Sequence, residues 1–321
     1  MNLPSENLDT TFEQLLQELP ANYRELAIEF KAFARSRKVK TPEQLLRVVM
    51  GYCGIDEVLR ETAGTFTLLE ERISDTAIHR RLKACGRWVK ALLSRMMDAA
   101  VQPLAEGHLR FLAIDGSTVQ SPGATGADYR VHLAIDLVRL HLVEVTVTNE
   151  HTGEHLRHYS LQDGDVVVAD QGYNQVAMWM DQADRGVGLV VRYNPHGLPL
   201  YDAEGTKIEV EAVLSAPGAT ELCLPTQVRN RGHQQLAGHL HALRLPSAQA
   251  AAARRRARAT AAKKGHQPQA RTLAFAEWVL IWTTLPPEVL STATIMAFYR
   301  VRWQIERVFK RLKSILKMDR L

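Results

Sequence analysis

Residues 297–313 read AFYRVRWQIERVFKRLK, and this stretch decides how the rest of the chain is interpreted. Apolar side chains recur at helical spacing through Val301, Ile305, Val308 and Leu312. Such a stripe is typical of one amphipathic helix whose apolar face packs on a core. We therefore expect a single helix across the whole stretch.

Four polar residues lie along the edge of that stripe: Tyr299, Arg302, Glu306 and Lys313. At about 100° per residue they fall within roughly 60° of one another. A carboxylate flanked by a phenol and two cations suits a metal ion and a phosphate. The alternative is an ordinary surface helix whose Arg/Glu pairs stabilise it only slightly.

Two apolar runs upstream each end in an aspartate. LRFLAID (109–115) ends at Asp115 and DVVVAD (165–170) ends at Asp170. Both predict buried strands with an acid at the carboxyl end. Taken singly, either aspartate is more often a turn residue. Asp128, Asp136 and Asp165 are competing carboxylates, but none of them has this strand-end position.

The elements around these runs predict the topology of a sheet. We expect strands at 109–115, 129–137, 141–148, 165–170 and 187–192, a short helix at 154–159 and a longer one at 176–183. The order is βββαβαβ, with carboxylates ending the first and fourth strands. This order predicts an α/β fold with a mixed sheet flanked by helices, and it is the order that a ribonuclease-H-like sheet requires.

Residues 1–105 predict an all-helical domain. A capping box with proline at the first helical position begins at Thr41, and Ser74 and Asp75 precede a longer helix. We also expect helices at 11–19 and 23–34. The long helix has a basic face, which either contacts DNA or is simply solvated. Its members are His79, Arg80, Arg81, Lys83, Arg87, Lys90 and Arg95.

Residues 195–285 form a mostly β insertion in this interpretation. Strands are expected at 207–214, 220–229, 239–245 and 277–284, with a basic, alanine-rich helix at 247–264. That helix suits either a phosphate backbone or a solvated surface. The catalytic core is then 106–194 together with 286–321.

Composition sets weaker bounds. The net charge of +5 and pI of about 9.1 agree with an anionic partner. No apolar run reaches the length of a membrane span, and the first residues lack a signal-peptide pattern. Cys53, Cys85 and Cys223 are isolated, which fits a reducing cytoplasm better than a zinc site or a disulfide framework.

The spacing Tyr-x2-Arg-x3-Glu-x6-Lys, made here by Tyr299, Arg302, Glu306 and Lys313, resembles the signature of the family-four insertion-sequence transposases. The resemblance implies a DDE active site with catalytic, metal-binding Asp115, Asp170 and Glu306. Three such carboxylates can hold two divalent cations. Oxygen ligands favour Mg2+, with Mn2+ as a substitute.

The resemblance also implies how DNA is held. Tyr299, Arg302 and Lys313 would contact phosphates, as would Arg192, at the end of the strand that follows Asp170. Trp278 occupies the position of a tryptophan that stacks on a flipped base in hairpin-forming members. It is equally well a core aromatic residue.

The implied function is cut-and-paste DNA transposition. The enzyme would cleave transposon ends, pass through a hairpin, and join the ends to target DNA. The partners would be double-stranded DNA, as terminal inverted repeats and target, and a second copy in a homodimer. The location would be the bacterial cytoplasm, at the nucleoid.

Two departures from the family pattern keep alternatives open. Gln171 stands where members have arginine, and the sequence ends soon after Lys313, where members continue with further helices. One alternative is therefore a truncated, catalytically weak DNA-binding remnant. Another is a ribonuclease-H-like nuclease without strand transfer.

Overall fold

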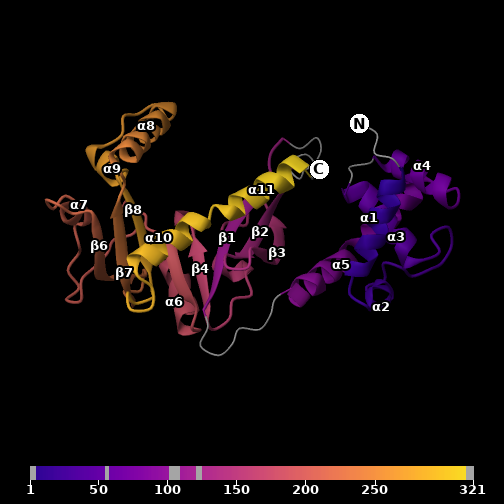
Figure 1. The fold of residues 1–321 in the computed structure, drawn as a ribbon, viewed down its shortest axis with the longest axis horizontal. Helices are drawn as coiled ribbons and strands as arrows, with labels where there is room; N and C mark the ends of the chain where they lie inside the picture. Colours follow the sequence, from indigo (N-terminus) through magenta and orange to yellow (C-terminus); the bar gives the residue numbers. More distant parts are fainter. Residues whose placement is uncertain (1–4, 55–57, 101–108, 121–124, 316–321) are drawn as a thin grey trace. The chain divides into compact units, whose positions relative to one another are not determined.

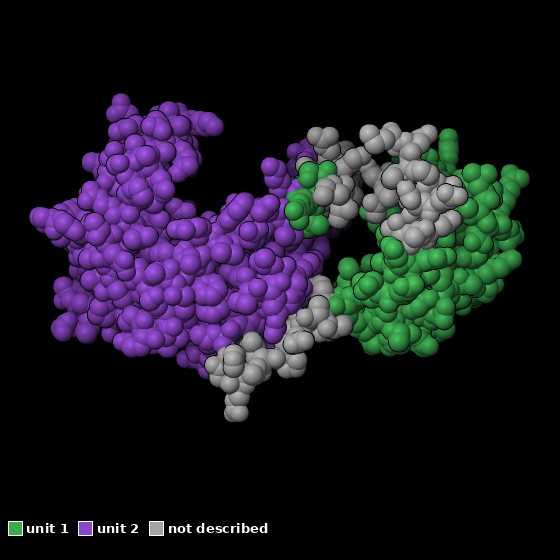
Figure 2. Space-filling view, in the orientation of Figure 1, with its two compact units in different colours: residues 1–103, 311–318 green, residues 104–310, 319–321 purple. Residues whose placement is uncertain are grey.

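The computed structural model describes residues 5–54, 58–100, 109–120 and 125–315, and these fold as two compact units. Figure 2 colours one unit, made mainly of residues up to 103, green, and the other, made mainly of residues 104–310, purple. The boundaries of the three expected domains stay predictions.

The first unit is helical and has its own core. Its elements are α1 (Ser5–Glu18), α2 (Tyr23–Glu29), α3 (Pro42–Val49), a π-helical turn (Met50–Gly54), α4 (Leu59–Leu69) and α5 (Asp75–Ala100). The core forms around Trp88, which is fully buried and donates a hydrogen bond from Nε1 to the Tyr23 carbonyl at 3.0 Å. The helix expected at 23–34 ends early because Lys31 has a φ of 59°.

The helix starts expected from the sequence are present. The Thr41 hydroxyl accepts a hydrogen bond from the Gln44 backbone at 3.2 Å, and Pro42 is the first helical residue. The second hydrogen bond of the capping box differs from the expected one. The Gln44 side-chain oxygen accepts from the Lys40 backbone N–H at 2.6 Å, instead of from the Thr41 backbone. Before α5, Ser74 Oγ accepts from the Ala77 backbone at 3.3 Å.

The second unit is built on a mixed eight-stranded sheet in the order β3-β2-β1-β4-β5-β8-β7-β6 (Figure 1). The strands are β1 (Arg110–Val119), β2 (Tyr129–Asp136), β3 (His141–Asn149), β4 (Asp165–Ala169), β5 (Gly188–Arg192), β6 (Glu221–Arg229), β7 (Gln235–Arg244) and β8 (Trp278–Thr283). The helices are α6 (Val176–Asp184), α7 (Val210–Leu214), α8 (Ser247–Lys263), α9 (Ala270–Phe275), α10 (Thr292–Val301) and α11 (Gln304–Ile315), with 3-10 turns at Leu156–His158 and Gln171–Tyr173. Helix α11 begins in this unit, and its residues from Arg311 onward are grouped with the first unit.

The first five strands have the expected order and the expected ribonuclease-H-like connections. β1 runs antiparallel to β2 and parallel to β4, and β4 runs parallel to β5. β4 is buried along its whole length, as its valine run predicts for a central parallel strand. β8, β7 and β6 continue the same sheet, because β8 pairs antiparallel with β5.

Helices cover both faces of this sheet. On one face, Trp179 of α6 stacks on Trp282 of β8 with ring centroids 4.9 Å apart. On the other face, Phe298 of α10 stacks on Phe111 of β1 at 3.8 Å. Figure 1 shows α10 lying across the strands. Because side chains alternate along a strand, the residues of β1 that share a face with Phe111 point toward α10.

Two expected elements are wrong. The stretch 207–214 is not a strand: it contains the short helix α7, which buries Val210 and Leu214 four residues apart. The helix expected across 297–313 is interrupted at Arg302 and Trp303, so that α10 and α11 are separate. The backbone forms a tighter, 3-10-like turn there, because the Ile305 N–H donates to the Arg302 carbonyl, three residues earlier, at 3.0 Å.

Candidate active site

The two aspartates lie side by side on neighbouring strands. The parallel pairing of β1 with β4 ends with Ala113 opposite Val168, and two residues further along are Asp115 and Asp170. Residues two apart share a face, so both side chains belong to the face that α10 covers. The expectation that Asp115 ends its strand is wrong, because β1 continues to Val119 beside β2. Asp170 directly follows β4.

Arg192 continues this row on the next strand. Ala169 pairs with Val191, so Arg192 is the neighbour of Asp170 across β4 and β5. The side chain of Arg192 is exposed at the end of β5. The sheet thus sets two acids and one cation at the same edge.

Helix α10 brings the signature tyrosine to this edge. The Tyr299 hydroxyl donates a hydrogen bond to Asp170 Oδ1 at 3.1 Å. Burial raises the pKa of Tyr299, and the nearby Asp170 carboxylate raises it further. Tyr299 therefore stays a hydrogen-bond donor.

Arg302 and Glu306 lie one helical turn apart across the break between α10 and α11. Arg302 Nη2 donates to Glu306 Oε1 at 2.8 Å, and its guanidinium lies over the Tyr299 ring at 5.3 Å. The Arg302 side chain is 9% exposed and that of Glu306 is 57% exposed. Arg302 Nε is buried without a hydrogen-bond partner in the described part of the chain. A donor of that kind is suited to an anion that enters from outside.

The charges of Arg302 and Glu306 both affect the carboxyl group of Asp115. Burial raises the pKa of the Asp115 carboxyl to about 6. Its own hydrogen bond from the Gly116 backbone and the Arg302 charge oppose the rise, whereas the negative charges of Glu154 and Glu306 add to it. Two further carboxylates, of Glu154 and Glu306, are therefore close enough to Asp115 to affect its charge.

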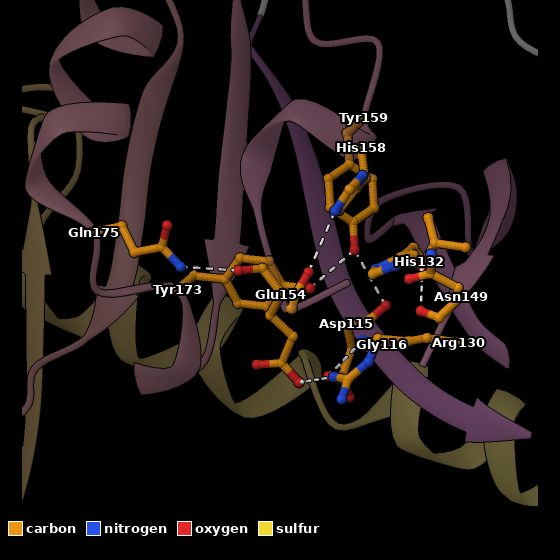
Figure 3. A network of polar contacts seen from close by, with 12 residues as sticks. Asp115, Gly116, Arg130, His132, Asn149, Glu154, His158, Tyr159, Tyr173 and Gln175 are labelled. Carbon is orange, nitrogen blue, oxygen red and sulfur yellow. Dashed lines mark hydrogen bonds and ion pairs between the residues drawn. The ribbon is translucent and has the colours of Figure 1, made fainter. Parts of the chain in front are cut away.

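Glu154 was missed in the sequence. It lies between β3 and β4, where its Oε1 is 3.4 Å from Arg130 Nη1. Figure 3 shows it in one polar network with Asp115 and Gly116. A glutamate outside any predicted strand gives no signal by spacing alone, so only the fold reveals its neighbours.

The competing aspartates have structural roles instead. Asp165 is fully buried and accepts two hydrogen bonds from Arg110, at 2.7 and 2.9 Å. Asp136 Oδ1 accepts from the backbone of Val138 and Arg139 in the turn before β3. Both lie away from the row formed by the two site aspartates.

Trp278 is not placed with the carboxylates. Trp278, Leu280 and Trp282 belong to the core on the face that α6 covers, opposite to α10, and Trp278 is 7% exposed. Its ring helps to line a pocket of about 200 Å³, and the Arg244 guanidinium lies 5.8 Å from its centroid. Lys313 lies in the last turn of α11.

The three predicted metal ligands do not form a ready cage. Within the described residues, no three His, Cys, Asp or Glu side chains are grouped closely enough to bind an ion together. Glu306 is turned to Arg302, while Asp115 and Asp170 are adjacent. The donor set nevertheless fits a hard divalent cation, because it consists of carboxylate oxygens.

A ribonuclease-H-like sheet with adjacent aspartates and a helix-borne glutamate at one edge defines the class of enzymes that transfer phosphoryl groups in nucleic acids. The chain belongs to the transposase DDE domain family, whose profile matches residues 106–321. It is 28% identical over 299 residues to InsL, a transposase by its name, of insertion sequence element IS186A in Escherichia coli K12. That match covers 90% of this chain and 80% of InsL.

A second relative gives the same picture. The transposase for insertion sequence element IS421 of Escherichia coli is 28% identical over 300 residues, covering 90% of this chain and 81% of the relative. The expected resemblance to insertion-sequence transposases and the expected fold class are confirmed. In addition, no described helix has the length and apolar character of a membrane span.

Proposed function

We propose that this DDE transposase cleaves the ends of its element and joins them to target DNA by using Asp115, Asp170 and Glu306 at one edge of the sheet. The chain is an enzyme of the DNA transposase class, as its family and relatives indicate. The observation that supports the site assignment is the link between signature and sheet: Tyr299 donates to Asp170, which is aligned with Asp115.

The family implies a divalent metal. We assign it to Asp115, Asp170 and Glu306, and we take it to be two Mg2+ ions, replaceable by Mn2+. To share an ion with the aspartates, Glu306 must turn away from Arg302. Bound there, the ions would supply a water or 3′-hydroxyl of lowered pKa and stabilisation of the leaving oxygen.

The other residues of the site act on the DNA. Arg302, released from Glu306, has a free guanidinium edge for a phosphate, and Arg192 offers a second cation on the same face. Tyr299 holds Asp170 in place, and its single hydroxyl proton must turn from Asp170 to reach a phosphate. In this proposal Lys313 contacts phosphate further along α11, because seven residues of helix carry it about 10 Å beyond Glu306.

Two further assignments are less direct. Trp278 lies on the other face, so stacking on a flipped base requires the base to enter the pocket beside Arg244. We also propose that two copies act as a homodimer on paired inverted repeats and target DNA, with hairpin ends as intermediates. The exposed basic residues of α5 and α8 are suited to phosphate contacts in such a complex.

The test is metal-dependent cleavage of DNA carrying the element's terminal repeats. With Mg2+, we expect Asp115→Asn, Asp170→Asn and Glu306→Gln to reduce cleavage to background. Asp184→Asn, an exposed acid on α6, is the matched control and should cleave like the wild type. Wild-type activity in all three site variants would reject the assignment. Joining of a labelled 3′ end to a plasmid separates a transposase from a nuclease without strand transfer.

A further inference from the structure

Glu154 occupies space that two glycines leave open beside the two site aspartates. Gly116 follows Asp115, and a Cβ on it would lie 3.6 Å from Glu154 Cγ. Gly172 lies two residues after Asp170, and a Cβ on it would overlap Glu154 Oε2. The Glu154 side chain therefore extends from the strand that carries Asp115 to the turn that follows Asp170.

The backbone of this glutamate is fixed to the elements that carry those aspartates. Gln175, just after the Asp170 turn, donates from Nε2 to the Glu154 carbonyl at 2.9 Å. Tyr159, on the same segment as Glu154, donates from its hydroxyl to the Asp115 carbonyl at 3.1 Å. Figure 3 shows these contacts around Glu154. The backbone that carries the Glu154 side chain is thus tied to β1 and to the segment that follows Asp170.

The charge on Glu154 is met by a long ion pair. Among the described residues, its ion-pair partner is Arg130, at 3.4 Å, which is longer than a strong charge-assisted hydrogen bond. Burial raises the pKa of Glu154, and the nearby Asp170 carboxylate raises it further against the effect of Arg130. A half-buried acid placed among other acids is stabilised by a cation that joins them.

Glu154 also approaches from a direction that the signature residues do not cover. Gly116 is on the opposite face of β1 from Asp115, because neighbouring residues of a strand alternate. Tyr299 belongs to α10, which packs on the Asp115 face through Phe298 and Phe111. Glu154 therefore borders the aspartates from the side opposite to the signature helix.

We propose that Glu154 is a fourth carboxylate of the divalent-cation site, holding an ion or its bound water beside Asp115 and Asp170 from the face opposite to Glu306. This inference rests on the proposed function of those residues as a Mg2+ site. The contrasting role is a purely structural one, in which Glu154 only pairs with Arg130.

The experiment measures Mn2+ binding to the full chain without DNA, by electron paramagnetic resonance of the free ion. We expect Glu154→Gln and Asp115→Asn each to weaken Mn2+ binding roughly tenfold or more. Glu150→Gln removes a charge from the same connection, where Glu150 pairs with His151, and should change binding less than about twofold.

Gly172→Ala gives an independent test, because its methyl group would displace the Glu154 carboxylate while leaving all charges in place. We expect it to weaken Mn2+ binding like Glu154→Gln, and to add nothing further in the double variant. Circular dichroism confirms that each variant is folded. The melting temperature of metal-free Glu154→Gln at pH 7.5 should equal or exceed that of the wild type, because repulsion among the acids is relieved.

Three results would overturn the inference. Unchanged Mn2+ affinity in Glu154→Gln, with affinity lost in Asp115→Asn, would reject Glu154 while keeping the site. A lowered melting temperature with full Mn2+ affinity would make Glu154 a structural partner of Arg130. Unchanged affinity in Asp115→Asn as well would reject both the metal assignment and this inference.

Discussion

At the residue scale, Asp115 links the stability of the fold to its chemistry. Burial and two neighbouring carboxylates raise its pKa to about 6, from 3.8 in an unperturbed aspartate. The folded protein thus binds the proton of the Asp115 carboxyl more tightly than the unfolded chain does. The stability contributed by Asp115 is then greatest at low pH and falls as pH rises from about 4 to 6.

The first prediction follows from that sign. We expect Asp115→Asn to raise the melting temperature of the metal-free protein at pH 7.5, because the variant avoids burying a charge. The gain should shrink as pH falls through 6 and vanish near 4. Thermal melts in chelator from pH 4 to 8 measure it, with Asp184→Asn as the control. A gain that is the same at every pH would contradict the raised pKa.

The second prediction at this scale concerns the guanidinium group of Arg302. Lysine keeps the charge but has no planar fork, so Arg302→Lys cannot offer a phosphate two parallel hydrogen bonds. We expect DNA cleavage to fall by about 10–100-fold while Mn2+ binding is kept. Arg307→Lys, exposed and stacked on Trp303 at 4.9 Å, is the control. Equal cleavage in Arg302→Lys and wild type would show that only the charge matters.

At the scale of elements, the sheet depends on a close approach between β7 and β8. A Cβ at Gly238 would overlap the Thr283 carbonyl oxygen and the Trp282 ring. Backbone cannot yield as a flexible side chain does, so Gly238→Ala should destabilise the second unit by about 1–3 kcal/mol. Urea unfolding measures this.

Gly126→Ala is the matched control for that change, because no heavy atom lies within 4 Å of its Cβ position. The two variants add the same methyl group to the same unit. If they unfold at the same urea concentration, β7 and β8 are not packed as closely as described.

The strands were predictable because burial on both faces leaves an unbroken apolar run. That signal located β1 and β4, and with them Asp115 and Asp170. The helix break at Arg302 could not be predicted, because apolar side chains recur at helical spacing across it, at Val301 before the break and at Ile305 after it. Periodicity reports which face is buried and not whether each backbone hydrogen bond is made.

Long-range contacts escaped the sequence for a different reason. The alternation in 207–214 is compatible with a strand, but two buried residues four apart, Val210 and Leu214, stabilise one helical turn. The pairing of β8 with β5 joins residues about 90 positions apart, which no local pattern encodes. Glu154 belongs to the same group, since its neighbours Gly116 and Gly172 are identified only by the fold.

At the scale of the whole molecule, the two units have separate cores, so heat should unfold them in separate steps. Trp88 is fully buried in the first core, and Trp282 is fully buried in the second, where its Nε1 donates to Thr226 at 3.1 Å. Replacing a buried tryptophan with alanine costs about 3–5 kcal/mol. We expect Trp88→Ala to lower the midpoint temperature of one calorimetric transition of the full chain, and Trp282→Ala to lower that of the other.

The paired design makes each variant the control for the other, since both remove the same side chain from a fully buried position. Circular dichroism at 222 nm should assign the Trp88-sensitive transition to the all-helical unit, because that unit lacks strands among its described residues. A single transition shifted equally by both variants would show that the units unfold cooperatively. Independent unfolding would instead allow the helical unit to be exchanged without disturbing the sheet that carries Asp115 and Asp170.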